Sequence, residues 1–175
     1  MRYLFLTLGY HPDIAGGAYR YVTEVAERLV RRGRRVDVVC PKAFDGLALK
    51  ETRNGVCIHR FANASGFFYS NWKAENLAAS ILAEKVLGDG DEPCVLILCH
   101  AFLAPATEML TCPKVFFFTG PWGLEYGFSR SGVNRSPVRR LLDVLIRRQM
   151  MRVERRALKA SRSILTISRY YSDQL

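Results

Sequence analysis

Apolar residues change their spacing from one segment of the chain to the next, and these changes predict alternating strands and helices. Residues 2–8 form a mostly apolar run without clean alternation, as expected for a strand that is covered on both faces in a parallel sheet. From Ala18 the apolar positions instead follow helical spacing, and they share one stripe: Val22, Val25, Ala26, Leu29 and Val30. Gly33 ends this predicted helix, because glycine adopts the left-handed conformation of a helix terminus without steric cost.

The same alternation continues to the end of the chain. Further strands are predicted at residues 36–40, 56–61, 94–99, 114–119 and 163–167. Helices are predicted at about residues 71–87, in a short piece at 107–110, and from Ser136-Pro137 to about residue 160. Residues 120–135 contain several glycines without a clear period and are predicted to be a long loop. Strands that alternate with helices in this way predict an α/β fold with a mainly parallel sheet.

Length and composition narrow the class of protein. A chain of 175 residues with 49% hydrophobic content fits one domain with a real core. No apolar run approaches the roughly 20 residues that span a bilayer, and the first run is too short for a signal peptide. We therefore expect a cytoplasmic protein. The five cysteines form no C-x-x-C pair and are expected to be small core residues.

Positive charge is concentrated in the last quarter of the chain. The net charge is +10, and residues 130–175 hold 12 basic and three acidic side chains. Such a basic helix can bind an anionic surface or can be an ordinary solvated face. Nucleic acid is disfavoured because no binding motif or aromatic platform accompanies the charge. An anionic membrane is the expected partner, at the inner membrane face, through Arg139, Arg140, Arg147 and Arg148.

Gly16 and Gly17 are adjacent in the turn between the first predicted strand and the first predicted helix. In an open parallel sheet this turn commonly binds an anion. Without β-carbons the pair would let a ligand approach the backbone, and the free amides at the helix start would favour a phosphate. The spacing matches neither G-x-G-x-x-G nor the P-loop, so a simple tight turn remains the alternative.

Several short motifs follow one another along essentially the whole chain. They are Tyr10-x-Pro12 with Gly16-Gly17, Asn54-Gly55-Val56 through Arg60-Phe61, a strand at 95–100 that ends in histidine, Thr119-Gly120-Pro121-Trp122 with Glu125, and residues 160–168. In this order and spacing they resemble the N-terminal domain of the retaining glycosyltransferases of the group 1 type, family 4. That resemblance implies a Rossmann-like three-layer sandwich, the N-terminal half of the two-domain GT-B architecture.

The resemblance also implies an activity. Members of this family transfer a sugar, with retention, from a nucleotide-sugar donor to a sugar, lipid-linked or polysaccharide acceptor, and need no further cofactor. The acceptor is held mostly by the N-terminal domain, which here spans residues 1–175. We expect the C-terminal nucleotide-sugar-binding domain to lie outside this chain, so that the isolated domain is inactive. No metal is expected. A non-catalytic binding module of the same fold is the alternative.

Two predicted catalytic positions depend on this resemblance. His100 would line the cleft at the end of the fourth strand, although a buried histidine bonded to the backbone is an alternative. Thr119 stands where the family usually has a histidine. Because threonine does not carry a proton charge near neutral pH, His100 or His11 would take over part of that work, or the activity is altered.

The other predicted site residues are assigned to the two substrates. By position, Gly16 and Gly17 would contact the donor diphosphate. His11, Trp122 and Glu125 are expected on the acceptor side. Trp122 could instead be a core anchor, and Glu125 could be a solvated loop carboxylate.

Overall fold

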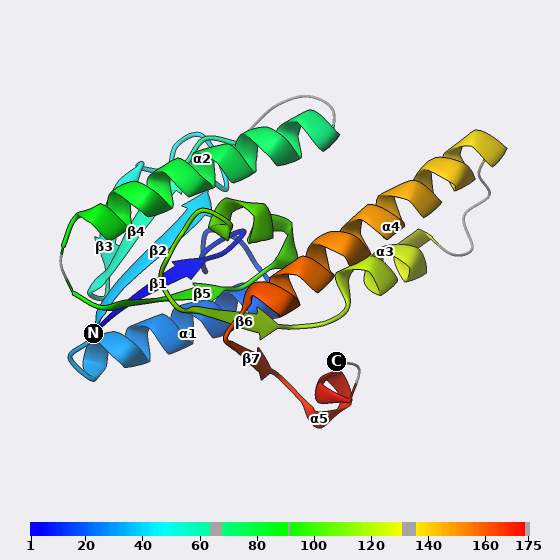
Figure 1. The fold of residues 1–175 in the computed structure, drawn as a ribbon. Coiled ribbons are helices and arrows are strands. Elements are labelled where there is room, and N and C mark those ends of the chain that lie inside the picture. Colours follow the sequence, from blue (N-terminus) through cyan, green and yellow to red (C-terminus); the bar gives the residue numbers. More distant parts are fainter. Residues whose placement is uncertain (64–67, 91, 131–135, 174–175) are drawn as a thin grey trace.

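The computed structural model describes residues 1–63, 68–90, 92–130 and 136–173, and it contains one seven-stranded sheet (Figure 1). The strands are β1 (Arg2–Leu6), β2 (Arg35–Pro41), β3 (Lys50–Arg53), β4 (Val56–Phe61), β5 (Cys94–Leu98), β6 (Lys114–Phe118) and β7 (Ser163–Thr166). Their order across the sheet is β3-β4-β2-β1-β5-β6-β7. All neighbours are parallel except β3 and β4, which form an antiparallel hairpin. The predicted α/β class and mainly parallel sheet are confirmed.

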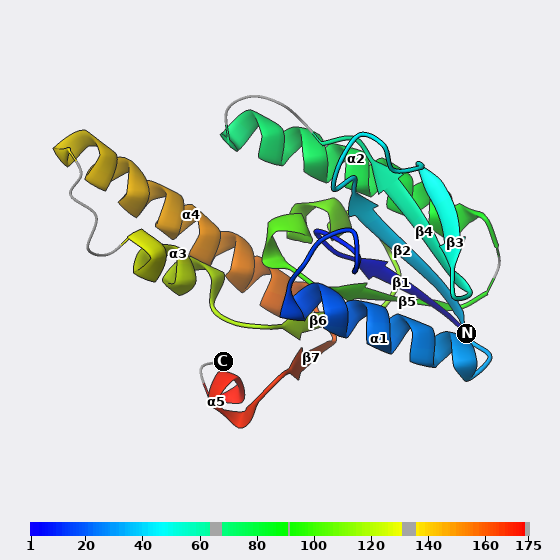
Figure 2. The same cartoon turned by 180° about the vertical axis from the view of Figure 1, so that it is seen from behind.

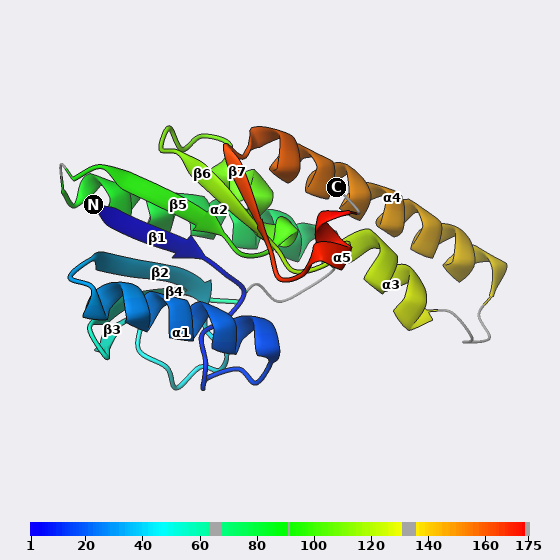
Figure 3. The ribbon, with the colours of Figure 1, turned by 90° about the horizontal axis from the view of Figure 1, so that it is seen from below.

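Helices cover the two faces of the sheet unequally. They are α1 (Gly17–Arg31), α2 (Phe68–Gly88), the 3-10 helix η1 (Ala101–Thr107), α3 (Trp122–Arg130), α4 (Pro137–Ala160) and α5 (Arg169–Ser172). Helix α1 packs on one face, and α2 and α4 pack on the other (Figures 2 and 3). The chain steps one way across the sheet from β1 to β2 and the opposite way from β4 through β7. Right-handed crossovers therefore place the connecting helices on opposite faces.

Two apolar layers hold the helices to the sheet. Successive residues of β1 point to opposite sides, so that Leu4 belongs to the α2 layer and Phe5 to the α1 layer. Ala26 of α1 and Ala79 of α2 are both fully buried, which lets each helix lie close to the strands. Among the described helices, none is both long enough and apolar enough to cross a membrane.

Two predictions near the carboxyl edge of the sheet are wrong. The loop predicted at residues 120–135 contains helix α3, and residues 131–135 lie outside the described part. The local sequence does not predict this helix, because its glycines have low helix propensity. Packing against α4 compensates for that low propensity. The short helix predicted at 107–110 is instead the 3-10 helix that begins at Ala101, where the His100 side chain caps it.

Helix α4 begins where Ser136-Pro137 predicts, and the Ser136 side chain accepts a hydrogen bond from the Arg139 amide. Only its second half carries apolar residues into the core, for example Met150 and Val153. The first half extends with α3 beyond the carboxyl edge of the sheet (Figures 1 and 3). The prediction that Leu141, Leu142 and Leu145 point to the sheet is therefore wrong, since all three are exposed.

Candidate functional site

The loop between β1 and α1 brings Gly16 and Gly17 to the carboxyl edge of the sheet, and both are exposed. Gly16 has φ 151° and ψ 147°, a conformation that side chains disfavour, and a β-carbon there would lie 3.0 Å from the Tyr19 ring. A β-carbon on Gly17 would meet no described atom within 4 Å. The backbone thus requires glycine at position 16, whereas position 17 leaves open space beside the helix start.

We expect Gly16→Ala to lower the free energy of unfolding by about 1–3 kcal/mol, because alanine is strained at this φ and ψ. Gly17→Ala should leave stability unchanged or raise it slightly, since alanine favours a helix over glycine. Urea unfolding of both variants, followed by circular dichroism, measures the difference. Equal stability of the two variants would contradict the distinction between the glycines.

The start of α1 is open to an anion. Its N-cap residue Gly16 provides no side-chain cap, and the first turn contains no acidic residue. The first amides of a helix have no partner within the helix, and the positive end of the helix dipole lies beside them. An anion that binds next to Gly17 would therefore meet unpaired N–H groups in a favourable field.

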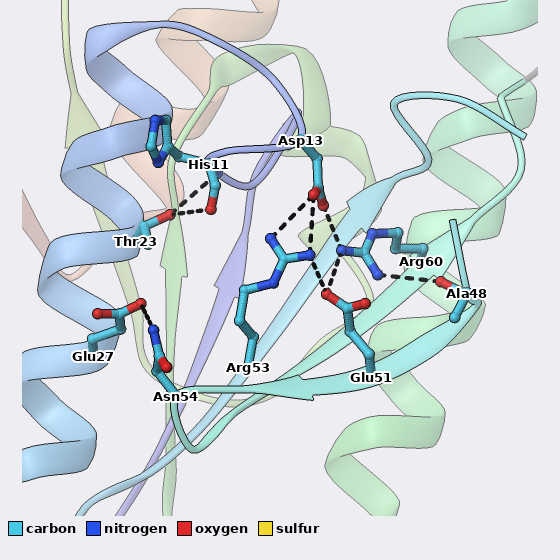
Figure 4. A network of polar contacts seen from close by, with 9 residues as sticks. All are labelled: His11, Asp13, Thr23, Glu27, Ala48, Glu51, Arg53, Asn54 and Arg60. Carbon is cyan, nitrogen blue, oxygen red and sulfur yellow. Dashed lines mark hydrogen bonds and ion pairs between the residues drawn. The ribbon is translucent and has the colours of Figure 1, made fainter. Parts of the chain in front are cut away.

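Polar contacts hold this loop on both sides (Figure 4). Asp13 Oδ1 accepts hydrogen bonds from Arg53 at 3.0 and 3.1 Å, and Asp13 Oδ2 accepts one from Arg60 at 2.5 Å. Glu51 joins the same two arginines at 2.6 and 3.0 Å. On the other side, the His11 amide donates to Thr23 Oγ1 at 3.2 Å. These contacts fix the position of the loop relative to β3, β4 and α1.

A small polar hollow lies next along the same edge, where β5 and β6 end. Its lining includes His100, Thr119, Trp122 and Glu125, together with Glu154 from α4. The space inside is about 20 Å³, close to what one water molecule needs. The structure thus gathers four of the predicted site residues. His11 is not among the residues that line this hollow, and Figure 4 shows its ring on the α1 side of the loop.

His100 has a structural role in addition to its place in the hollow. Its Nδ1 accepts the amide N–H of Phe102 at 3.0 Å, which caps η1. Burial lowers the pKa of His100 to about 4. The ring is therefore neutral at pH 7 with its proton on Nε2, and it can donate one hydrogen bond to a ligand. A group with this pKa is a poor general base near neutral pH.

Trp122 and Glu125 begin helix α3. The Trp122 ring makes edge contacts with His100 and Phe102, with ring centroids 5.2 and 5.9 Å apart. It thus anchors one wall of the hollow. Glu125 is exposed, so its carboxylate is available to a ligand's hydroxyl groups.

Glu154 was missed by the sequence analysis. It lies 8% exposed on α4, and its Oε1 accepts the Trp122 amide at 2.8 Å. Burial raises the pKa of Glu154, and the negative charge of the nearby Glu125 raises it further. The hydrogen bond from the Trp122 amide lowers the pKa, but it does not outweigh these two effects. One sequence signal was available: Glu154 is an isolated acidic residue in a basic helix, on the same helical face as Met150 and Ala157.

One cluster of the described residues has ligand atoms close enough for a metal ion. Asp37, Cys57 and His59 place these atoms within 4.8 Å of one another. However, Asp37 Oδ2 already accepts from Arg2 Nε at 2.7 Å, and Asp37 Oδ1 lies 2.9 Å from His59 Nε2. The arginine charge opposes a cation at this place, so the cluster fits a buried ion pair better than a metal centre.

Known proteins resemble this chain in sequence pattern and in fold. A family model described as Glycosyltransferase Family 4 matches residues 15–175. No curated protein sequence gives a match. Among solved structures, sucrose-phosphate synthase from Thermosynechococcus elongatus is 12% identical with a TM-score of 0.76, over 99% of this chain and 44% of that one.

Two further solved structures resemble the chain less closely. A UGT transferase from Siraitia grosvenorii in complex with UDP is 13% identical with a TM-score of 0.56, over 94% of this chain and 44% of that one. Os79 from O. sativa in complex with UDP is 13% identical with a TM-score of 0.58, over 94% of this chain and 46% of that one. At such identities the likeness concerns the fold. The chain spans less than half the length of each of these proteins.

Proposed function

The chain belongs to glycosyltransferase family 4, and from this premise we propose that it is the acceptor-binding domain, residues 1–175, of a hexosyltransferase. The parent enzyme would move a sugar, with retention, from a nucleotide-sugar donor to a sugar, lipid-linked or polysaccharide acceptor. One observation carries the proposal. An open helix N-terminus at Gly17 and a polar hollow at His100 lie on the same edge of one parallel sheet.

Gly17 is assigned to the donor. The amides at the start of α1 would bind the diphosphate and stabilise the charge that grows on the leaving nucleotide. The UDP complexes of two of the similar structures support a nucleotide-sugar donor for this chain. Gly16 would shape the turn that presents these amides, and the Asp13 contacts would hold the loop in place.

His100 and Thr119 are assigned to the reacting sugar or the acceptor. The neutral His100 ring would donate a hydrogen bond from Nε2, and the Thr119 hydroxyl would donate or accept one. Neither would transfer a proton as a strong base. Glu125 would accept from an acceptor hydroxyl, while Trp122 forms the wall behind it. His11 stays a proposed acceptor contact that lies outside the hollow.

A transfer assay tests this proposal. The domain is joined to a nucleotide-sugar-binding domain of the same family and incubated with UDP-, GDP- and ADP-sugars, and the anomeric configuration of the product is read by NMR. We expect hydrolysis or transfer with retention for at least one donor, and none from the domain alone. The absence of both hydrolysis and transfer with every donor would favour the alternative of a non-catalytic binding module.

A second proposal concerns an anionic membrane, and an exposed patch on α4 favours it. Four apolar residues lie on one stripe of the helix and are 51–68% exposed: Val138, Leu141, Leu142 and Leu145. The same stripe continues toward the C-terminal end of the helix with Arg152, Arg156 and Lys159. Exposed Arg139 and Arg148 flank this stripe. Arg140 and Arg147 lie on the opposite side of the helix, where Arg147 packs against Gly127 of α3. An apolar stripe with adjacent arginines matches the interface of an anionic bilayer.

Vesicle sedimentation tests the membrane contact. We expect binding to vesicles that contain anionic lipid, weakening at high salt. Arg139→Ser with Arg148→Ser should lower the partition constant about 30-fold, because each basic residue near anionic lipid contributes about 1 kcal/mol. The control pair Arg32→Ser with Arg34→Ser, which follows the C-terminal end of α1, removes the same charge and should change the partition constant little. Equal losses for the two pairs would contradict a defined surface.

A further inference from the structure

We propose that Glu154 is a positioning residue of the candidate site, because it fastens the first turn of α3, and with it Trp122, to helix α4. This role belongs to the same site and rests on the proposed function for its biological meaning. Glu154 holds one wall of the hollow whether or not the parent protein transfers a sugar.

Helix α3 lacks the local features that normally start a helix. The residues before Trp122 are Gly120 and Pro121, and neither has a side chain that can accept a hydrogen bond from the helix amides. The helix is nine residues long and contains Gly123 and Gly127. A peptide of this length and composition would not form a stable helix by itself in water. The stability of α3 must therefore come from its neighbours.

Helix α4 provides the missing cap from another part of the chain. The carboxylate of Glu154 accepts the Trp122 amide at 2.8 Å, 32 residues away in sequence. A carboxylate at this position also interacts favourably with the positive end of the helix dipole. Glu154 is 8% exposed, so little water competes for the hydrogen bond.

Further contacts along α3 and α4 agree with this docking. A β-carbon on Gly123 would lie 2.5 Å from Met151 Cγ, so the two helices touch at the first turn of α3. One turn later Gly127 faces the Arg147 side chain, and Tyr126 donates to Asp143 Oδ1 at 2.8 Å. The glycines permit the close approach, and Glu154 fixes where the first turn begins.

The position of this turn determines the shape of the hollow. Trp122 is the residue whose amide Glu154 binds, and its ring lies against His100 and Phe102. Glu154 also lines the hollow itself. Loss of the carboxylate should therefore loosen the wall that faces His100 while the sheet stays intact.

Hydrogen–deuterium exchange on the 175-residue chain tests the proposal. In Glu154→Ala we expect the amides of residues 122–130 to exchange about tenfold faster, the size of a typical lost cap, with the amides of β1 and β5 unchanged. Glu154→Gln keeps an acceptor oxygen and should restore most of the protection. In a Trp72→Phe background, Trp122 emission should shift to longer wavelength in Glu154→Ala and return in Glu154→Gln.

Val153→Ala is the matched control. Val153 is the neighbouring buried residue of α4 and belongs to the apolar layer. Its truncation should weaken the whole domain without selective exchange in α3. The proposal is overturned if Glu154→Ala leaves α3 as protected as α4, or if Val153→Ala opens α3 to the same degree. These readouts do not involve sugar transfer, so an inactive parent enzyme would leave their result unchanged.

Discussion

Replacing Asp37 by alanine is expected to lower the free energy of unfolding by about 3–5 kcal/mol, because it leaves the Arg2 guanidinium buried without its partner charge. The two side chains are 1–2% exposed and lie 2.7 Å apart. Among the described atoms, Arg2 NH1 has no hydrogen-bond partner, so the guanidinium depends on Asp37. His59 bonds the other carboxylate oxygen and would lose its contact as well. Urea unfolding at pH 7 measures the effect.

An exposed ion pair of the same protein is the control. Glu24 and Arg28 lie 3.5 Å apart on α1, with side chains 48% and 67% exposed. Glu24→Ala should change stability by less than about 0.5 kcal/mol, because water screens this pair. Replacing both buried charges, Arg2→Met with Asp37→Leu, should recover most of the stability lost in Asp37→Ala. A double variant as unstable as the single one would contradict this account.

The effect of Asp37 should also depend on pH. Burial by itself raises the pKa of Asp37, but hydrogen bonds from His59 and Arg2 outweigh it and hold the pKa below its ordinary value of 3.8. The folded state therefore binds this proton less readily than the unfolded state does. The contribution of the charged Asp37 to folding stability is fully present when the pH is above the ordinary pKa of 3.8. It is lost as the pH falls through the lowered pKa of the folded state. The stability difference between wild type and Asp37→Ala should shrink accordingly in acid.

Replacing Gly17 by valine is expected to lower kcat/KM of the parent transferase about 100-fold, comparable to the loss of one backbone donor at a site of developing charge. The new side chain would fill the open space beside the start of α1 and keep a phosphate away from the amides. Steady-state kinetics with the active nucleotide sugar measure the loss, which should persist at saturating acceptor.

Gly88→Val is the matched control for this variant. Gly88 is also helical, at the end of α2, and a β-carbon there likewise meets no described atom within 4 Å. Both variants replace a helical glycine by valine, whose helix propensity is slightly higher, and they should unfold at similar urea concentrations. Only Gly17→Val should lose transfer. Equal activity of the two variants would exclude the start of α1 as the donor phosphate site.

Much of the fold could be predicted from the sequence because it is encoded in short windows. Apolar runs indicated the positions of β1, β2, β4, β5, β6 and β7, and Ser136-Pro137 indicated the start of α4. Such signals depend on backbone geometry and on which side of an element is apolar, and both are properties of neighbouring residues. The hairpin partner β3 is short and polar, and no apolar run predicted it.

The candidate site could be predicted only in part. The turn at Gly16 and Gly17, and the residues at the ends of β5 and β6, follow from the rule that ligands bind at the carboxyl edge of a parallel sheet. The resemblance gave His100 and Thr119 as catalytic and Trp122 and Glu125, with His11, as acceptor contacts, and the structure gathers all of these except His11 around one hollow. Position alone could not show that His100 is bonded to the backbone and stays neutral.

The sequence by itself determined the alternation of strands and helices, the glycine turn and the family, since each is written in residues that are adjacent or regularly spaced. Tertiary structure alone decided that α3 is a helix, that Glu154 caps it, and that Arg2 pairs with Asp37. It also decided that the first half of α4 lies outside the core. The physical reason is that these features depend on contacts between distant segments, whose energies outweigh the local preferences of the chain.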